Sequence, residues 1–386
     1  MKASTTVLDR PRSQVNIIRA LPWILALAWT VVQTYLLYTH GIGTTLEAHK
    51  YIEQAQIFLN TGHFESPNFC LYSVQIFLIA AAIKLSLGFV AVVAVQLLFN
   101  ALAAYSLFKL ATKLSNPITA FWCTLLLICN IPFQTFNTLL YTESLFYSFT
   151  ILLSCYLLSL EKLNAARFGI ITLFLLLICF TRPTGLLFVP CVFLYLFYRF
   201  FHSLHVIIKA GVILVSVVLF GLILNAALGS GGELDFLLPF REEHIICGVP
   251  TLNDHGVTIS NDNSLKGILQ YIIHHPLQFA HLAWLRSLAF FGLVRSYYST
   301  SHNIFLAAYF YPIYVLTIFS MRTWWFKNRA LLLYCIALVF ATWSTVILTC
   351  DDWHNRFFLT VIPVFYLLSL PALSRFLSLL IAKKHA

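Results

Sequence analysis

The stretch Gly41–Asn68, GIGTTLEAHKYIEQAQIFLNTGHFESPN, is the first polar interruption after an apolar segment of membrane-spanning length. It contains Glu47, His49, Glu53 and Glu65, although only 10% of the 386 residues are charged. Ionisable side chains next to membrane helices are costly and commonly functional. We therefore expect this loop to form the floor of a reaction site, in which Glu47 faces a lipid-borne substrate.

The composition indicates an integral membrane protein. Hydrophobic residues make up 60% of the chain, and its mean hydropathy is +0.84. A soluble domain could not cover so much apolar surface. The apolar runs are continuous, which favours helices. We predict an all-α, polytopic membrane helix bundle that forms a single domain over residues 1–386. About 10–12 apolar segments are expected, near 18–39, 70–87, 88–112, 117–138, 141–160, 167–182, 184–201, 206–228, 278–297, 302–321, 330–349 and 357–380.

Charge predicts the orientation of these segments, because cytoplasmic loops collect Lys and Arg. About ten spans with both termini inside satisfy this rule if 70–112 crosses once and 278–297 does not cross. The outer face then carries 12 of the 14 acidic residues, in loops that include 40–69 and 230–277. We expect a multi-pass protein of a bacterial inner or plasma membrane with its active site on the non-cytoplasmic side. The net charge of +10 suits an anionic bilayer surface and not nucleic acid.

The nine cysteines are odd in number, and most lie inside apolar runs without metal-ligand spacing. We interpret them as small packing residues and expect no disulfide framework.

Two acids are candidates for chemistry. Glu47 opens a helix that Thr44 or Thr45 could cap, with Tyr51 one turn later. A carboxylate near an apolar wall can serve as a general base; the alternative is a solvated charge on an interfacial helix. Glu143 begins another apolar segment, where it could bind substrate or simply be an acid that the helix dipole stabilises at a helix N-terminus.

Two arginines are candidates for binding a phosphate. Arg182 lies between apolar runs at a helix break made by Pro183 and Gly185, and Arg356 opens the last span. A fixed guanidinium at the membrane boundary suits a phosphate, whereas a snorkelling membrane anchor is the alternative. We also expect Tyr51 and His354, beside these charges, to contact substrate.

A divalent metal is the one cofactor that the sequence suggests. Asp351, Asp352 and His354 could contribute ligands, completed by Glu47 or His49. The spacing is not specific, and an ordinary polar turn is the alternative reading.

The order of these motifs resembles the GT-C superfamily of polytopic glycosyltransferases, which includes protein O-mannosyltransferases and lipid A aminoarabinose transferases. The resemblance covers residues 1–228 and 350–380. It differs in one respect, because many members carry an Asp where this chain has Glu47. The matching motifs are Glu47, Tyr51 and Ala55 followed by Gly62; Thr142-Glu143-Ser144; Thr181-Arg182-Pro183-Thr184-Gly185; and Arg356-Phe357-Phe358 before Pro363.

The resemblance implies an inverting transfer of a sugar from a polyprenyl-phosphate donor to a lipid, glycan or protein acceptor. Glu47 would be the base, Glu143 would orient the acceptor or the sugar or hold a metal, and the two arginines would neutralise the leaving phosphate. Three other functions stay open: a transporter or flippase, an inactive structural partner in envelope-polysaccharide assembly, and an acyltransferase. Charges gathered at one face disfavour the transporter, and the absence of a histidine in the middle of any apolar run disfavours the acyltransferase.

Overall fold

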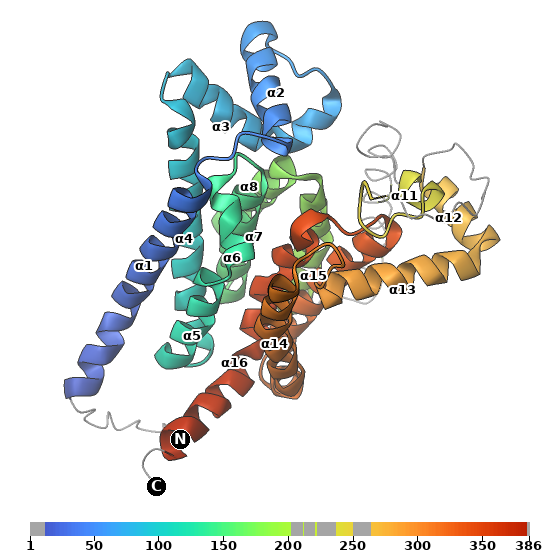
Figure 1. Cartoon of the computed structure of the whole chain (residues 1–386). Coiled ribbons are helices and arrows are strands. Elements are labelled where there is room, and N and C mark those ends of the chain that lie inside the picture. Colours follow the sequence, from blue (N-terminus) through green and yellow to red (C-terminus); the bar gives the residue numbers. More distant parts are fainter. Residues whose placement is uncertain (1–11, 202–210, 212–220, 222–236, 250–263, 384–386) are drawn as a thin grey trace.

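The computed structural model describes residues 12–201, 211, 221, 237–249 and 264–383. The described residues form helices joined by short connections and contain no β-strand, which confirms the predicted all-α bundle (Figure 1). The predicted segment 206–228, apart from residues 211 and 221, and the run 229–232 lie outside the described residues. The helices are α1 (Arg12–His40), α2 (Glu47–Thr61), η1 (Pro67–Tyr72), α3 (Ser73–Lys84), α4 (Gly88–Leu114), α5 (Pro117–Ile128), α6 (Ile131–Thr135), η2 (Phe136–Thr138), α7 (Glu143–Ser159), α8 (Ala165–Thr181), η3 (Pro183–Leu187), α9 (Phe188–Phe200), α11 (Leu238–Arg241), α12 (Leu265–His274), α13 (Pro276–Gly292), α14 (Thr300–Lys327), α15 (Arg329–Leu348), η5 (Trp353–Asn355) and α16 (Arg356–Lys383).

Within the described ranges, seven helical stretches are long and apolar enough to cross a membrane, or eight if the bent pair α5 and α6–η2 is one span. The shorter α7 and α8, of 17 residues each, are also apolar. This confirms a multi-pass membrane protein. Pro67–Lys84 is among the seven and α13 is not. The predicted total of about ten crossings stays a prediction.

Helix α16 forms the centre of the bundle. Of its most apolar 18-residue window 78% is buried, against 39% or less for the other candidate spans. It packs against α14, α15, α5 and α7. Its first residue therefore lies deep among other helices, although the chain enters it from a polar turn.

The helix ends gather at two opposite ends of the molecule. The start of α1 and the end of α16 lie at one end, α2 and α3 lie at the other, and α13 runs across the direction of α14 (Figure 1). At the first end, Lys113 forms a 3.3 Å ion pair with Glu161, and the Nζ of Lys327 donates to the carbonyl of Leu114 at 3.0 Å. Lysines, which are typical of cytoplasmic loops, therefore meet at the end of the molecule opposite α2.

Several helices begin where the sequence supplies a side-chain cap. Asn116 accepts a hydrogen bond from the N–H of Thr119 at the start of α5, and Asn164 and Asn328 act in the same way for α8 and α15. Helix α2 is an exception. The expected cap by Thr44 or Thr45 is wrong, because the residue before α2 is Leu46, with a φ of 56° and no side-chain cap.

The cysteine interpretation is corrected at one pair. Cys247 and Cys350 form a disulfide across 103 residues of sequence, whereas the other seven cysteines are free. Five of the free cysteines are buried, as expected for small packing residues in apolar runs. This interpretation fails for Cys247 and Cys350 because the fold brings these two together from a loop and a helix end.

Candidate active site

Arg356 joins three carboxylates at the end of the molecule that carries α2. Its Nη1 lies 2.6 Å from Glu47, 3.2 Å from Glu143 and 3.7 Å from Asp352. The Arg356 side chain is only 7% exposed, and that of Glu143 is fully buried. Burial excludes the water that would otherwise screen these charges, so the interactions are strong and the geometry is well defined.

Arg182 closes the cluster on its other side. It forms an ion pair with Glu143 and a second one with Asp352, at 3.0 Å. Burial on its own would lower the pKa of Arg182, but Glu143 and Asp352 raise it well above its usual range, so the guanidinium stays charged. The structure therefore brings Glu47, Glu143, Arg182 and Arg356 into one network. We call these four residues, with Asp352, the charge cluster.

The residues of the charge cluster lie at or beside helix ends, and backbone contacts hold these helix ends together. Gly43 pairs with the backbone around Leu139, since its N–H donates to Thr138 at 2.9 Å and its carbonyl accepts from Leu140 at 3.0 Å. This contact holds the segment before α2 against the segment before α7. Glu47 and Glu143 are the first residues of α2 and α7, Arg182 follows the last residue of α8, and Arg356 is the first residue of α16.

Gly185 makes the turn at Arg182. A Cβ at this position would lie 2.9 Å from the Cα of Cys179 and closer still to the carbonyl group of Ile178. The N–H of Gly185 donates to the carbonyl of Arg182 at 2.8 Å. A glycine is therefore needed for η3 to pack on the end of α8, and this packing directs Arg182 toward Glu143.

Aromatic rings border the charge cluster. The guanidinium carbon of Arg356 lies 5.5 Å from the ring centre of Tyr141 and 6.0 Å from that of Phe136. The hydroxyl of Tyr147 donates to the carbonyl of Arg356 at 3.0 Å. Tyr51 is 1% exposed, and its ring centre lies 5.6 Å from that of Tyr72, with the two rings tilted relative to each other. Burial raises the pKa of Tyr51 well above its usual range, so its hydroxyl stays protonated.

The remaining predicted residues lie outside the network. His354 is exposed, and no ion pair joins it to the described members of the charge cluster. The candidate metal ligands do not converge: His49 lies 3.8 Å from Glu53 on the surface of α2, Asp351 pairs with Arg295, and Asp352 pairs with both arginines of the cluster. Among the described residues, no three His, Cys, Asp or Glu side chains are grouped as metal ligands.

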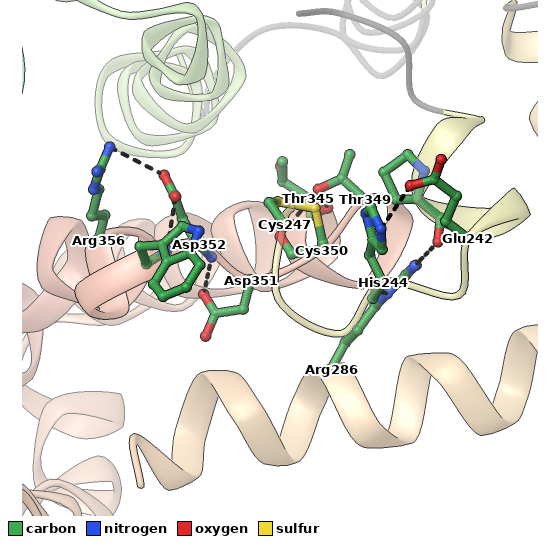
Figure 2. The surroundings of a disulfide bond; sticks show 12 residues. Glu242, His244, Cys247, Arg286, Thr345, Thr349, Cys350, Asp351, Asp352 and Arg356 are labelled. Atoms are coloured by element: carbon green, nitrogen blue, oxygen red, sulfur yellow. Dashed lines mark hydrogen bonds and ion pairs between the residues drawn. A yellow bond between two sulfur atoms is a disulfide. The ribbon is translucent and has the colours of Figure 1, made fainter. Parts of the chain in front are cut away.

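Sequence reasoning missed the contacts behind the charge cluster. Arg295 is 5% exposed and binds Asp351 and Asn355. In Figure 2, Asp352 points toward Arg356, whereas Asp351, the preceding residue, points to the opposite side. The adjacent pair Asp351-Asp352 was the one sequence feature that could have indicated these contacts, because two neighbouring acids in a turn can bind two different basic side chains.

No curated protein and no solved structure matches the chain significantly. A family model, described as the Alg9-like mannosyltransferase family, matches residues 16–228, which is more than half of the chain. This range includes Glu47, Glu143 and Arg182, and the family has the GT-C fold, as the motif order predicted. The protein therefore belongs to the Alg9-like mannosyltransferase family, a family of membrane glycosyltransferases.

Proposed function

We propose that the protein transfers mannose from a polyprenyl-phosphate donor to a hydroxyl of a lipid, glycan or protein acceptor, with inversion, on the non-cytoplasmic side of the membrane. The observation that carries the proposal is the direct 2.6 Å contact between Arg356 and Glu47. A cation suited to phosphate and a carboxylate suited to proton abstraction lie side by side at a membrane boundary.

Glu47 is the base in this mechanism. Its side chain is 34% exposed, and it is the most accessible acid of the charge cluster. It takes the proton of the acceptor hydroxyl as the acceptor oxygen bonds to the anomeric carbon. The bond from that carbon to the phosphate oxygen breaks, and polyprenyl phosphate leaves with the electron pair. General-base catalysis of this kind contributes about 10²- to 10⁴-fold in rate.

Arg356 is the principal cation for the leaving phosphate. Its Nε–H is buried and has no hydrogen-bond partner among the described residues. A buried donor without a partner is costly, and a phosphate oxygen is a fitting acceptor. When the donor phosphate binds the Arg356 guanidinium, the ion pair between Arg356 and Glu47 weakens. The Glu47 carboxylate is then free to accept a proton. Fixed donors aimed at developing charge supply much of the rate of such reactions.

Two observations support the choice of side. The Cys247–Cys350 disulfide lies beside the charge cluster, and disulfides persist in oxidising compartments. The basic residues at the opposite end follow the rule for cytoplasmic loops. A transporter is less well supported, because Glu47, Glu143, Arg182 and Arg356 all lie at helix ends.

The test is transfer by the purified protein in proteoliposomes, with an alkyl mannoside as acceptor. Radiolabelled mannose is supplied either on polyprenyl phosphate or on a nucleoside diphosphate. We expect product from the lipid donor alone. Product from the nucleotide donor alone would overturn the donor class, and no product from either would favour an inactive partner or a different sugar. Glu161→Gln is the matched control, since Glu161 is an exposed acid at the other end of the molecule.

A further inference from the structure

The turn Cys350–Arg356, which we call the cluster turn, carries Asp352 and Arg356. Residues outside the charge cluster hold this turn in place. The disulfide binds its first residue to Cys247. Next to it, the N–H of Asp351 donates to the carbonyl of Ile245 at 2.8 Å, and the N–H of Cys247 donates to the carbonyl of Asp351 at 2.8 Å. The segment 237–249 thus fixes the start of the cluster turn from outside the bundle (Figure 2).

Arg295 fixes the remainder of the cluster turn. Its Nη2 binds the carboxylate of Asp351 and lies 2.7 Å from Oδ1 of Asn355. Asn355 also donates to the carbonyl of Leu293 at 3.2 Å. Arg295, Asp351 and Asn355 are 5%, 0% and 4% exposed. Arg295 has ion-pair contact with Asp351 but not with the described acids of the charge cluster, so it influences Asp352 and Arg356 only through the turn.

The backbone of the cluster turn needs such support. His354 and Asn355 both adopt left-handed conformations, with φ of 58° and 57°. A residue other than glycine in this region is uncommon, and two in succession persist only where the surroundings hold them. Without the contacts of Asn355, the turn can relax toward ordinary backbone angles, and Arg356, the next residue, would rotate with it.

The segment 237–249 is itself anchored. Arg286, on α13, is fully buried, and its guanidinium donates to the carbonyls of His244 at 2.9 Å, Pro239 at 2.8 Å and Ile347 at 2.8 Å. These three bonds join the segment to α13 and to the end of α15. The disulfide is therefore attached to a firm support and not to a free loop.

We propose that Arg295 and the Cys247–Cys350 disulfide are positioning elements of the transferase, which hold Asp352 and Arg356 where the donor phosphate must leave. The inference rests on the proposed function. Its basis is geometric, because a displacement of about 1 Å at a reacting centre can lower a rate by about 10²-fold. Loss of either element leaves every residue of the charge cluster in the sequence but no longer fixes two of them.

The experiment compares the parent protein in nanodiscs with Arg295→Lys, Arg295→Ala and Asp351→Asn. It also compares the parent before and after reduction with a phosphine, which converts the disulfide into two thiols as the phosphine becomes its oxide. We expect reduction and Arg295→Ala to lower the single-turnover rate by about 10²-fold, with a much smaller change in donor affinity. Arg295→Lys should retain part of the rate, because an ammonium can pair with Asp351 but not bind Asn355 as well. Cys335→Ser, which replaces a buried free thiol, should respond to reduction as the parent does.

Hydrogen exchange of the amides in 245–247 and 351–356 is the second readout, and it does not depend on transfer. We expect faster exchange there after reduction and in Arg295→Ala, with unchanged protection in α7. If the parent transfers no mannose, the exchange result still decides whether the two elements hold the turn. Unchanged exchange and rate would overturn the proposal. So would an equal fall in rate and donor affinity that follows loss of folded protein, since this is what a general structural role produces.

Discussion

At the scale of single residues, the two arginines of the charge cluster differ in what they hold. Arg182 is fixed between Glu143 and Asp352, whereas Arg356 also reaches Glu47 and keeps an unpartnered Nε–H among the described residues. The guanidinium fork binds phosphate oxygens in pairs, and an ammonium does not. Arg356 therefore has the features of the phosphate cation, and Arg182 has those of a support for the acids.

We predict that Arg356→Lys lowers the single-turnover rate by about 10²-fold, more than it lowers donor affinity, because charge develops on the phosphate in the transition state. Arg182→Lys should retain a larger share of the rate. The measurement is donor binding and single-turnover transfer for both variants in nanodiscs. The opposite order would assign the leaving phosphate to Arg182, and parent-like rates in both variants would remove arginine from the mechanism.

The pH dependence of stability provides a second prediction at this scale. Burial raises the pKa of Asp351 from 3.8 to about 6, although Arg295 favours the carboxylate. Because the folded protein holds this proton more tightly than the unfolded chain does, the group stabilises the fold at low pH and this stabilisation is lost as pH rises through about 6. The change amounts to about 3 kcal/mol.

The comparison is thermal unfolding of the parent and Asp351→Asn between pH 4 and pH 7. Asparagine does not titrate, so the stability of the parent relative to this variant should fall as pH rises. A constant difference, or one that increases with pH, would show that Asp351 is not the titrating group described here.

At the scale of elements, the contact between η3 and α8 sets the direction of Arg182. We predict that Gly185→Ala destabilises the protein by about 1–3 kcal/mol, because the added methyl meets backbone atoms that cannot move aside. Transfer should also fall as Arg182 is displaced from Glu143. Gly169→Ala is the matched control. It lies in α8, a Cβ there meets nothing within 4 Å, and alanine should be neutral or stabilising in a helix.

Both variants are assayed for thermal unfolding and for transfer. Equal behaviour of Gly185→Ala and Gly169→Ala would mean that the turn at Arg182 accepts a side chain and does not depend on close packing.

The helix ends are where the sequence was most informative. Glu47, Glu143, Arg182 and Arg356 stand at boundaries between polar and apolar runs, and a common side of the membrane brings such boundaries to one level. The sequence therefore predicted which residues would be near one another. It could not predict their pairing, because the pairing depends on how the helices pack around α16.

The sequence could not predict the contacts that support the cluster turn, for a different reason. Cys247 and Cys350 are separated by 103 residues, and the apolar context of most cysteines argued against a bond. Arg295 lies near the end of the apolar segment 278–297 in the sequence, yet in the fold it pairs with Asp351. Contacts of this kind arise from tertiary structure, and no local pattern or propensity marks them.

At the scale of the whole molecule, sidedness is the property to test. The charge cluster and Lys162 lie at the two ends of α7. We predict that His63→Cys reacts with an impermeant maleimide on intact cells and that Lys162→Cys reacts only after lysis. The background has the seven free cysteines replaced and the disulfide retained. The reverse labelling pattern would place the charge cluster in the cytoplasm.

The central claim is that the charge cluster transfers a sugar with Glu47 as its base. The most direct measurement is single-turnover mannose transfer by Glu47→Gln in nanodiscs, together with donor affinity, beside Glu47→Asp and the remote control Glu161→Gln. We predict that Glu47→Gln binds donor but transfers about 10²- to 10⁴-fold more slowly. Glu47→Asp should retain part of the rate, and Glu161→Gln should match the parent. Parent-like transfer by Glu47→Gln would contradict the account, because a glutamine cannot take the proton.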